Sequence, residues 1–121
     1  MPNTLKDSDV EKGYQASLSW LALLDKENYS ESWDQSSSLM KSTIENQSWN
    51  QILQQTRKNL GKVISRTIVD KRIAKNPKDL PPGNYLVMVY KTQFKNKASA
   101  LELVTLFLEN DQWRTVTYQS N

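Results

Sequence analysis

The sequence of 121 residues contains neither cysteine nor histidine. The lack of cysteine excludes disulfides, thiolate metal sites and thiol nucleophiles. The lack of histidine excludes Ser-His-Asp catalysis and every zinc site that needs imidazole. Unbroken hydrophobic runs such as Trp20–Leu24 are far short of the roughly 20 residues that cross a bilayer as a helix. We therefore expect no membrane span, no metal ion and no cofactor, and the sequence identifies no catalytic residue.

Glycine and proline are scarce as well, with three and four residues, and this excludes a collagenous or low-complexity composition. The length is that of one compact domain. We expect residues 1–121 to form a single domain, with the polar residues 1–8 as a disordered tail. The amino terminus has no apolar stretch of secretory type, but a removed signal would leave the same terminus, so the compartment stays open.

Charge is uneven along the chain, because residues 1–56 are acidic overall and residues 57–121 carry the excess that gives a net charge of +3. The basic residues begin as a stretch from Arg57 to Lys78, which could attract a phosphate-bearing partner. No aromatic residue in that stretch could stack on a base, however. We favour a solvated strand and loop over a nucleic-acid surface.

The first half of the chain has apolar residues at helical spacing. Val10, Tyr14, Leu18 and Leu21 recur at steps of four and three behind Ser8 and Glu11, which have the spacing of a capping box. The pattern predicts helices over about 8–26, just after Asn28, as a single turn near 39–44, and over about 46–60. Gly61 follows the last apolar residue, where a helix often ends in a left-handed cap.

From Lys62 onward the apolar period changes to two. This pattern predicts strands over 63–73, 85–95, 98–109 and 112–118, with a proline-rich loop over 76–84. Polar turns at Asn96-Lys97 and Asn110-Asp111 are short, and short connections make neighbouring strands antiparallel. We expect an α+β fold in which N-terminal helices pack on a curved, cone-like antiparallel four-stranded meander.

Both faces of this meander are expected to be apolar. If Asn96-Lys97 is a two-residue turn, Glu102 faces Lys91 and shares its side with Val87, Val89, Val104 and Leu106. The other side then collects Leu86, Met88, Tyr90, Leu101, Leu103 and Phe107. The helices can cover only one side, so the other should meet a second subunit, a partner protein or a ligand.

Glu102 is the central candidate for a functional residue, because an unpaired carboxylate among apolar neighbours is costly. One hypothesis is a pocket at the open end of the sheet, with Glu102 as its polar group. A neighbouring cation, Arg66, Arg57 or Lys91, would set the ionisation of this carboxyl group. Tyr29 and Trp33 would lie near the wall of the pocket. The other, which we favour, is a structural ion pair at the margin of the sheet. Asp25 ends the first helix and is expected in solvent.

Several dispersed residues carry a resemblance to a known family. They are the run Trp20–Asp25, then Tyr29, Ser32-Trp33, Trp49, Arg57, Leu60-Gly61, Ser65-Arg66, Tyr85, Phe94, Glu102–Leu106, Trp113-Arg114 and Tyr118. In these residues the chain resembles the bacterial family numbered 4019 among domains of unknown function. That family is similar to the nuclear transport factor 2-like (cystatin-like) superfamily, which implies helices packed into a bent sheet. The resemblance also implies bacterial origin and frequent export to the periplasm or envelope, but assigns no catalytic residue.

Function is therefore predicted only in outline. The first hypothesis is a non-catalytic binding module that forms a homodimer through the exposed sheet face. The alternative is an isomerase or hydratase that uses Glu102 as general base on an unknown small ligand. Fold alone does not choose between them.

Overall fold

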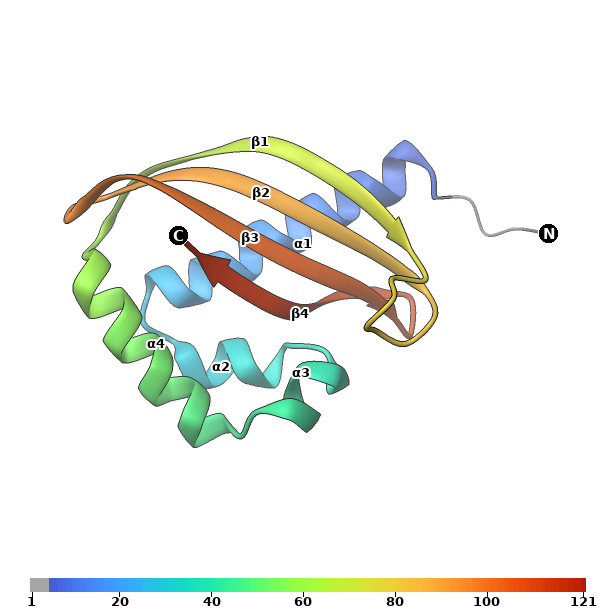
Figure 1. Cartoon of the computed structure of the whole chain (residues 1–121), viewed down its shortest axis with the longest axis horizontal. Coiled ribbons are helices and arrows are strands. Elements are labelled where there is room, and N and C mark those ends of the chain that lie inside the picture. Colours follow the sequence, from blue (N-terminus) through green and yellow to red (C-terminus); the bar gives the residue numbers. More distant parts are fainter. Residues whose placement is uncertain (1–4) are drawn as a thin grey trace.

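Four helices precede a four-stranded antiparallel sheet in this computed structural model, which describes residues 5–121 (Figure 1). The elements are α1 (Asp7–Asp25), α2 (Tyr29–Asp34), α3 (Ser38–Thr43), α4 (Asn46–Leu60), β1 (Val63–Lys75), β2 (Asn84–Phe94), β3 (Lys97–Glu109) and β4 (Gln112–Ser120). The strand order is β1-β2-β3-β4, so every strand pairs with its neighbour in sequence. The expected α+β meander is thus confirmed, as a curled sheet that does not close.

The start of α1 differs from the predicted capping box at Ser8 and Glu11. The N-cap residue is Lys6, whose backbone N–H donates to Asp9 Oδ2 at 2.8 Å. A carboxylate in the first turn also complements the positive end of the helix dipole. Residues 7 and 8 of the expected tail therefore belong to α1, and residues 1–4 lie outside the described part of the chain.

Helix α1 crosses the sheet and contacts all four strands (Figure 1). The closest approach is at Gly13, where an added Cβ would lie only 2.3 Å from Cδ1 of Leu86. A residue without a side chain at this position lets the helix lie directly against β2. Trp20, Leu21 and Leu24 continue the same buried face into the core.

The remaining helices form a second layer beside α1. Helix α4 packs mainly against α2, and their contact is fixed by Ser32, whose backbone oxygen accepts from Trp20 Nε1 and whose hydroxyl accepts from Trp49 Nε1, both at 2.9 Å. Ser37 caps α3 by accepting from Leu39 N–H at 3.1 Å. Gly61 ends α4 with a φ of +79°, as the sequence predicts.

The β2–β3 hairpin has a different register from the predicted one. Phe94 pairs with Lys97 across a Lys95-Asn96 loop, and a register shift between Thr92 and Phe94 then sets the remaining pairs, such as Tyr90 with Glu102. The predicted pairing of Glu102 with Lys91 is wrong. The turn lies one residue earlier than predicted, and the irregularity then shifts the pairs beyond it by one residue, so that Glu102 pairs with Tyr90. The second turn is as expected: Asn110 and Asp111 both have positive φ, as a tight hairpin requires.

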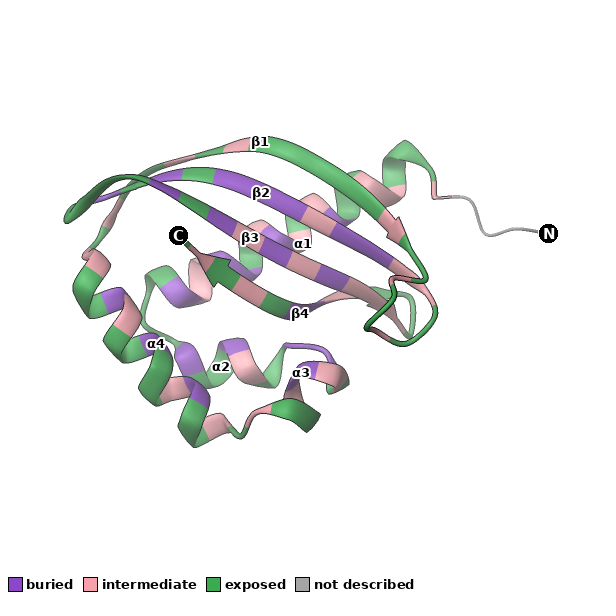
Figure 2. Ribbon diagram, viewed as in Figure 1, coloured by how far each residue is buried: buried purple, intermediate pink, exposed green. Residues whose placement is uncertain are grey.

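The observed register gives each face of the sheet its own residues. The face that meets the helices, called the inner face here, carries Leu86, Met88 and Tyr90 from β2 together with Glu102, Val104 and Leu106 from β3. The outer face carries Val87, Val89, Leu101, Leu103 and Phe107 and no helix covers it within residues 5–121 (Figures 1 and 2). The residues of β2 that were predicted to share a face with Glu102 therefore lie on the opposite face from it. Apolar residues nevertheless occupy both faces of the sheet, as predicted.

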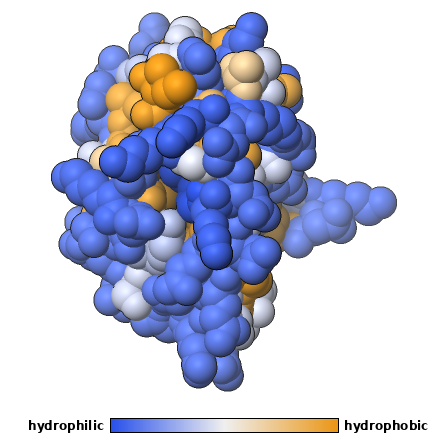
Figure 3. Space-filling view, turned by 90° about the vertical axis from the view of Figure 1, so that its left-hand side faces the viewer, coloured by the Kyte–Doolittle hydropathy of each residue, from blue (hydrophilic) through white to orange (hydrophobic). Residues whose placement is uncertain are grey.

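Burial follows this division. The central strand β3 alternates between buried and more exposed residues over its middle part, and β2 is buried over most of its length, whereas β1 is exposed along most of its length (Figure 2). The end of the molecule that holds the β2–β3 hairpin is hydrophilic over most of its surface, with hydrophobic residues gathered in its upper part (Figure 3). None of the helices within residues 5–121 is both long and apolar enough to cross a membrane.

Candidate functional site

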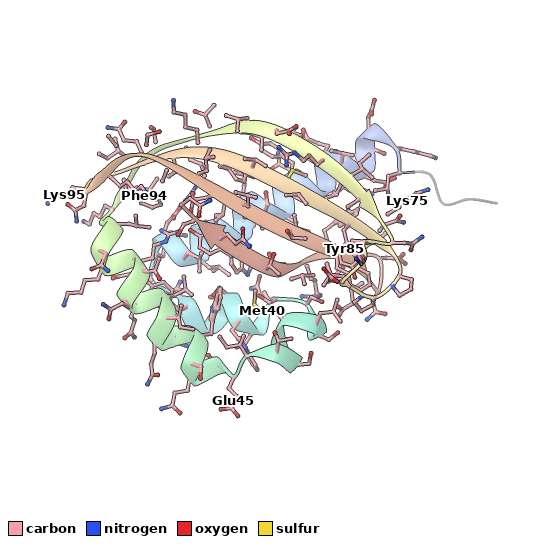
Figure 4. The ribbon with its side chains drawn as sticks, in the orientation of Figure 1. Met40, Glu45, Lys75, Tyr85, Phe94 and Lys95 are labelled. Carbon is pink, nitrogen blue, oxygen red and sulfur yellow. The ribbon has the colours of Figure 1, made fainter. Side chains whose placement is uncertain are left out.

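A cluster of charged and polar side chains lies at one end of the inner face. Each of its six members comes from a different element: Asp25 (α1), Arg57 (α4), Arg66 (β1), Thr92 (β2), Glu102 (β3) and Tyr118 (β4). We call these six residues the ion-pair cluster. Phe94 closes it at the hairpin end of the sheet, next to Lys95 (Figure 4). The cluster therefore joins α1, α4 and all four strands.

Glu102 is the centre of the ion-pair cluster and has no exposed surface. Its Oε1 accepts from Arg66 Nε at 2.8 Å and from Thr92 Oγ1 at 2.5 Å. Its Oε2 accepts from Arg57 Nη2 at 3.3 Å and from the Tyr118 hydroxyl. Four donors thus hold the two carboxylate oxygens, which offsets the cost of burying the charge.

Asp25 supplies the second carboxylate at the rim of the cluster. Arg66 binds it in a two-pronged geometry, Nη1 to Oδ2 at 2.8 Å and Nη2 to Oδ1 at 3.0 Å. Arg57 Nη1 adds a third bond to Oδ1 at 2.9 Å. The two arginines and two carboxylates therefore form a closed ring with no formal net charge, the arrangement in which buried charges cost least.

The environment shifts the pKa values of Asp25, Arg57 and Arg66 in directions that keep these three groups charged. Burial alone would raise the pKa of Asp25, but its hydrogen bonds and ion pairs with Arg66 and Arg57 outweigh burial and hold it below the ordinary value. Burial would lower the pKa of both arginines, and their acidic partners raise it instead. Burial raises the pKa of Tyr118, so its phenol stays protonated and donates to Glu102.

Aromatic rings enclose the guanidinium of Arg57. Its Cζ lies 5.3 Å from the centroid of the Phe94 ring and 6.0 Å from that of Tyr118. Both distances are in the range of cation–π attraction, which stabilises a guanidinium removed from water. Arg57 itself is only 7 % exposed, and its Nε has no hydrogen-bond partner within residues 5–121.

A cavity of about 220 Å³ lies against the outer rim of the cluster. Asp25 and Arg57 form part of its wall, and Tyr29 lies beside them. Lys58, Lys62 and Glu27 also contribute to its lining. The predicted residue Tyr29 thus lies near the cluster without any hydrogen bond to it.

Three of the predicted site residues, Glu102, Arg66 and Arg57, are brought into direct contact. Lys91 is not among them, because it pairs with Leu101 and points to the exposed outer face. Trp33 is also elsewhere: its Nε1 donates to the backbone oxygen of Ile44 at 2.9 Å. Its ring lies under the Lys41 ammonium rather than near Glu102.

Sequence reasoning missed Asp25, Thr92 and Tyr118. Asp25, expected in solvent, has a side chain only 28 % exposed and binds both arginines. Its spacing of four and seven residues from Leu21 and Leu18 places it on the apolar stripe of α1, a signal that was present in the sequence. Thr92 and Tyr118 could be found only from the correct strand register.

The chemistry of the cluster is that of a structural ion network. Every oxygen of Glu102 accepts two hydrogen bonds, so no lone pair is directed at a substrate that could lose a proton to it. Within residues 5–121 there is also no group of three or more acidic side chains that could hold a metal ion.

Comparison with known sequences places the chain in a family. No curated protein matches it. A family model does match residues 16–118, a span that includes all six residues of the ion-pair cluster. The chain belongs to the family described as "Protein of unknown function (DUF4019)".

Proposed function

We propose that this chain is a non-catalytic binding module that self-associates through the outer face of its sheet. The observation that carries the proposal is the apolar band of Val87, Val89, Leu101, Leu103 and Phe107, which no helix of the described residues covers. Leu101 is 44 % exposed at one end of the band. Val87, Leu103 and Phe107 are partly exposed, and Val89 between them is 6 % exposed. Apolar residues that reach an uncovered sheet face are typical of an interaction site.

A second copy of the chain fits this band better than a charged partner does. The five residues of the band are uncharged, and Lys91 lies beside Leu101 at one end of it. Two copies related by a twofold axis through the middle of the band would therefore bring apolar side chains together at the centre and keep Lys91 at the margin. At the β1 border, Asp70 and Arg72 present both signs. Sheets that pack face to face use such interdigitating apolar side chains.

The general-base alternative loses its support at Glu102. An enzyme of isomerase or hydratase type would need this carboxylate free to take a proton. Two arginines, a threonine and a tyrosine occupy it instead. In a binding module the ion-pair cluster would only hold the fold together. The four hydrogen bonds that occupy both oxygens of Glu102 support this structural role.

The proposal includes membership of the nuclear transport factor 2-like superfamily. The order of elements supports it, because helices come first and then pack into the curl of an antiparallel meander (Figure 1). That superfamily includes binding domains and scaffolds as well as enzymes, so the fold alone does not decide the activity.

Sedimentation at micromolar concentration tests self-association. The chain should sediment as a dimer, and Leu101→Lys should shift it to monomer because the ammonium would be buried in the interface. The matched control is Ile52→Lys, which changes a residue of similar exposure, 51 %, on α4 and should leave the dimer intact. A monomer at all concentrations, or equal effects of both substitutions, would overturn the proposal.

A further inference from the structure

A second cavity lies between α1 and the start of β4, away from the ion-pair cluster. Its volume is about 340 Å³, which is within the range of small-molecule sites. Two indole rings, Trp20 and Trp113, contribute to its lining, as do the cationic side chains Lys12 and Arg114. We call this space the α1–β4 cavity.

The lining of the α1–β4 cavity includes a buried hydroxyl without a partner. Thr115 is 1 % exposed, and its Oγ1 makes no hydrogen bond within residues 5–121. The backbone of Thr115 is tied down, because its carbonyl oxygen accepts from Ser37 N–H at 2.8 Å. A buried hydroxyl left unpaired is unfavourable, and such exceptions call for an explanation.

The polar groups near Thr115 are engaged elsewhere. Ser36 Oγ donates to Ser32 O at 2.7 Å and accepts from Trp20 Nε1 at 3.1 Å. Ser37 Oγ donates to Glu109 Oε1 at 2.6 Å. The hydroxyl of Thr115 therefore has no hydrogen-bond partner among these neighbours, and it lies sealed just behind the wall of the cavity.

The charges of the cavity favour an anion. Arg114 donates from Nη1 to Gln35 O at 3.1 Å and from Nη2 to Gln112 Oε1 at 2.5 Å. These bonds hold the guanidinium at the rim and leave further N–H donors. Lys12 forms no ion pair within residues 5–121, and Asp111 is the one acidic side chain in the lining. The cationic groups are therefore in excess.

We propose that the α1–β4 cavity binds a small aromatic carboxylate. The ring packs against the indoles of Trp20 and Trp113, in the offset or tilted geometries that aromatic pairs prefer. The carboxylate lies near Lys12 and Arg114, where charge-assisted hydrogen bonds are strongest. Rotation of the Thr115 side chain toward the ligand is part of the proposal, because Oγ1 is buried in the free chain; once turned, Oγ1 gains from the ligand the hydrogen bond that the protein does not supply. This site is independent of the outer face and does not rest on self-association.

Titration of the ¹⁵N-labelled chain with 2-naphthoate, followed by the indole N–H signals, tests the site. The Trp113 signal should shift with a saturable dependence on concentration, and the Trp33 signal, outside the cavity, should not. Two related probes separate the contributions: 2-naphthamide keeps the rings without the charge, and cyclohexanecarboxylate keeps the charge without an aromatic ring. Both should bind more weakly than 2-naphthoate.

Two variants locate the contacts within the cavity. Thr115→Val removes the hydroxyl at nearly constant shape and should weaken naphthoate binding roughly tenfold, the usual effect of one hydrogen bond. Its control is Thr105→Val on the outer face, which should not change binding. Lys12→Gln should weaken binding of naphthoate but not of naphthamide, and Lys26→Gln, beyond the end of α1, should weaken neither.

The outcomes are distinct from those of the sedimentation test. No saturable shift of Trp113 up to millimolar naphthoate would overturn the site, whatever the oligomeric state. Equal shifts of Trp33 and Trp113, or equal affinity for all three probes, would show general hydrophobic adsorption and would overturn it as well. Binding that Thr115→Val leaves unchanged would remove the hydroxyl from the proposal and with it the argument for this ligand class.

Discussion

Two buried threonines on the inner face of the sheet have opposite surroundings. Thr92, with no exposed surface, donates its hydroxyl proton to Glu102 within the ion-pair cluster. Thr115, 1 % exposed, lies in the α1–β4 cavity and donates to nothing within residues 5–121. Burial is the same, so burial alone does not distinguish a structural polar group from one available to a ligand. The two cases are distinguished by whether the protein itself supplies a hydrogen-bond partner for the hydroxyl.

The same contrast separates the two regions as a whole. In the ion-pair cluster two arginines and two carboxylates neutralise one another, and the donors that surround Glu102 use both of its oxygens. In the α1–β4 cavity the cationic groups outnumber the acidic one. We expect substitutions in the first region to cost stability and substitutions in the second to change binding.

The largest loss of stability is expected for Glu102→Gln. It leaves two arginines with a single carboxylate between them in a site from which water is excluded. Removing one partner of a buried ion pair costs about 3–5 kcal/mol. Urea denaturation should show this as a lower midpoint at an unchanged slope. The control is Glu45→Gln, at the exposed start of α4, and an equal loss in both variants would contradict the role of the cluster.

Thr92→Val should be the next most destabilising change. It removes one of the four donors to a buried carboxylate, and a hydrogen bond to a charged group is worth about 1.5–3 kcal/mol. The free energy of unfolding from urea denaturation gives the measurement. A variant as stable as the parent would mean that three donors suffice for Glu102, and the cluster would then be less tightly coupled than its geometry indicates.

Asp25 should give the chain a pH dependence at the acid end. Its pKa is lower in the folded chain than the ordinary 3.8, so the ionised form stabilises the fold above about pH 4 and this contribution disappears as the pH falls through the lowered value. The side chain is partly exposed, and the contribution of such pairs is at most about 1 kcal/mol.

Thermal melting between pH 2 and pH 6 measures this dependence. Asp25→Asn should flatten the acid part of the profile, and Asp34→Asn, on the exposed end of α2, should leave it unchanged. An unaltered profile in Asp25→Asn would assign the acid transition to other carboxyl groups.

The smallest effect, and the one of opposite sign, is expected for Thr115→Val. The substitution replaces an unpaired buried hydroxyl by a methyl group of the same shape, so stability should stay constant or rise by up to about 1 kcal/mol. Urea denaturation of Thr92→Val and Thr115→Val side by side makes the same chemical change in both regions. If both variants lose stability equally, Thr115 has a partner in solution and the contrast between the regions fails.

Much of the fold could be predicted from the sequence because its patterns are local. The change of apolar period near Lys62, the glycine after Leu60 and the turn at Asn110-Asp111 all specify the backbone within a few residues. The four strands and their order follow from the short connections between them. The differences at the start of α1, by one residue, and at the ends of the strands, by one or two residues, are small by comparison.

The composition of the candidate site could be predicted only in part. Glu102, Arg66 and Arg57 were identified because charged residues stand out in apolar surroundings. Lys91 was wrongly included because the β2–β3 pairing depends on an irregularity next to the hairpin that no sequence pattern marks. The α1–β4 cavity depends on how α1 lies beside β4, and contacts between elements far apart in sequence leave no periodic signal.

Arg57 has a consequence for how the molecule could open. Helix α4 packs chiefly on α2 rather than on the strands, and this one guanidinium joins it to Glu102 and Tyr118 on the inner face. At the end of α4, Asn96 of the β2–β3 hairpin donates to the backbone oxygens of Asn59 and Leu60, and the start of α3 is held separately, through Ser37, to Thr115 and Glu109. Amide hydrogen exchange in an Arg57→Met chain should therefore become fast in α4 first, ahead of global unfolding, while the start of α3 stays protected.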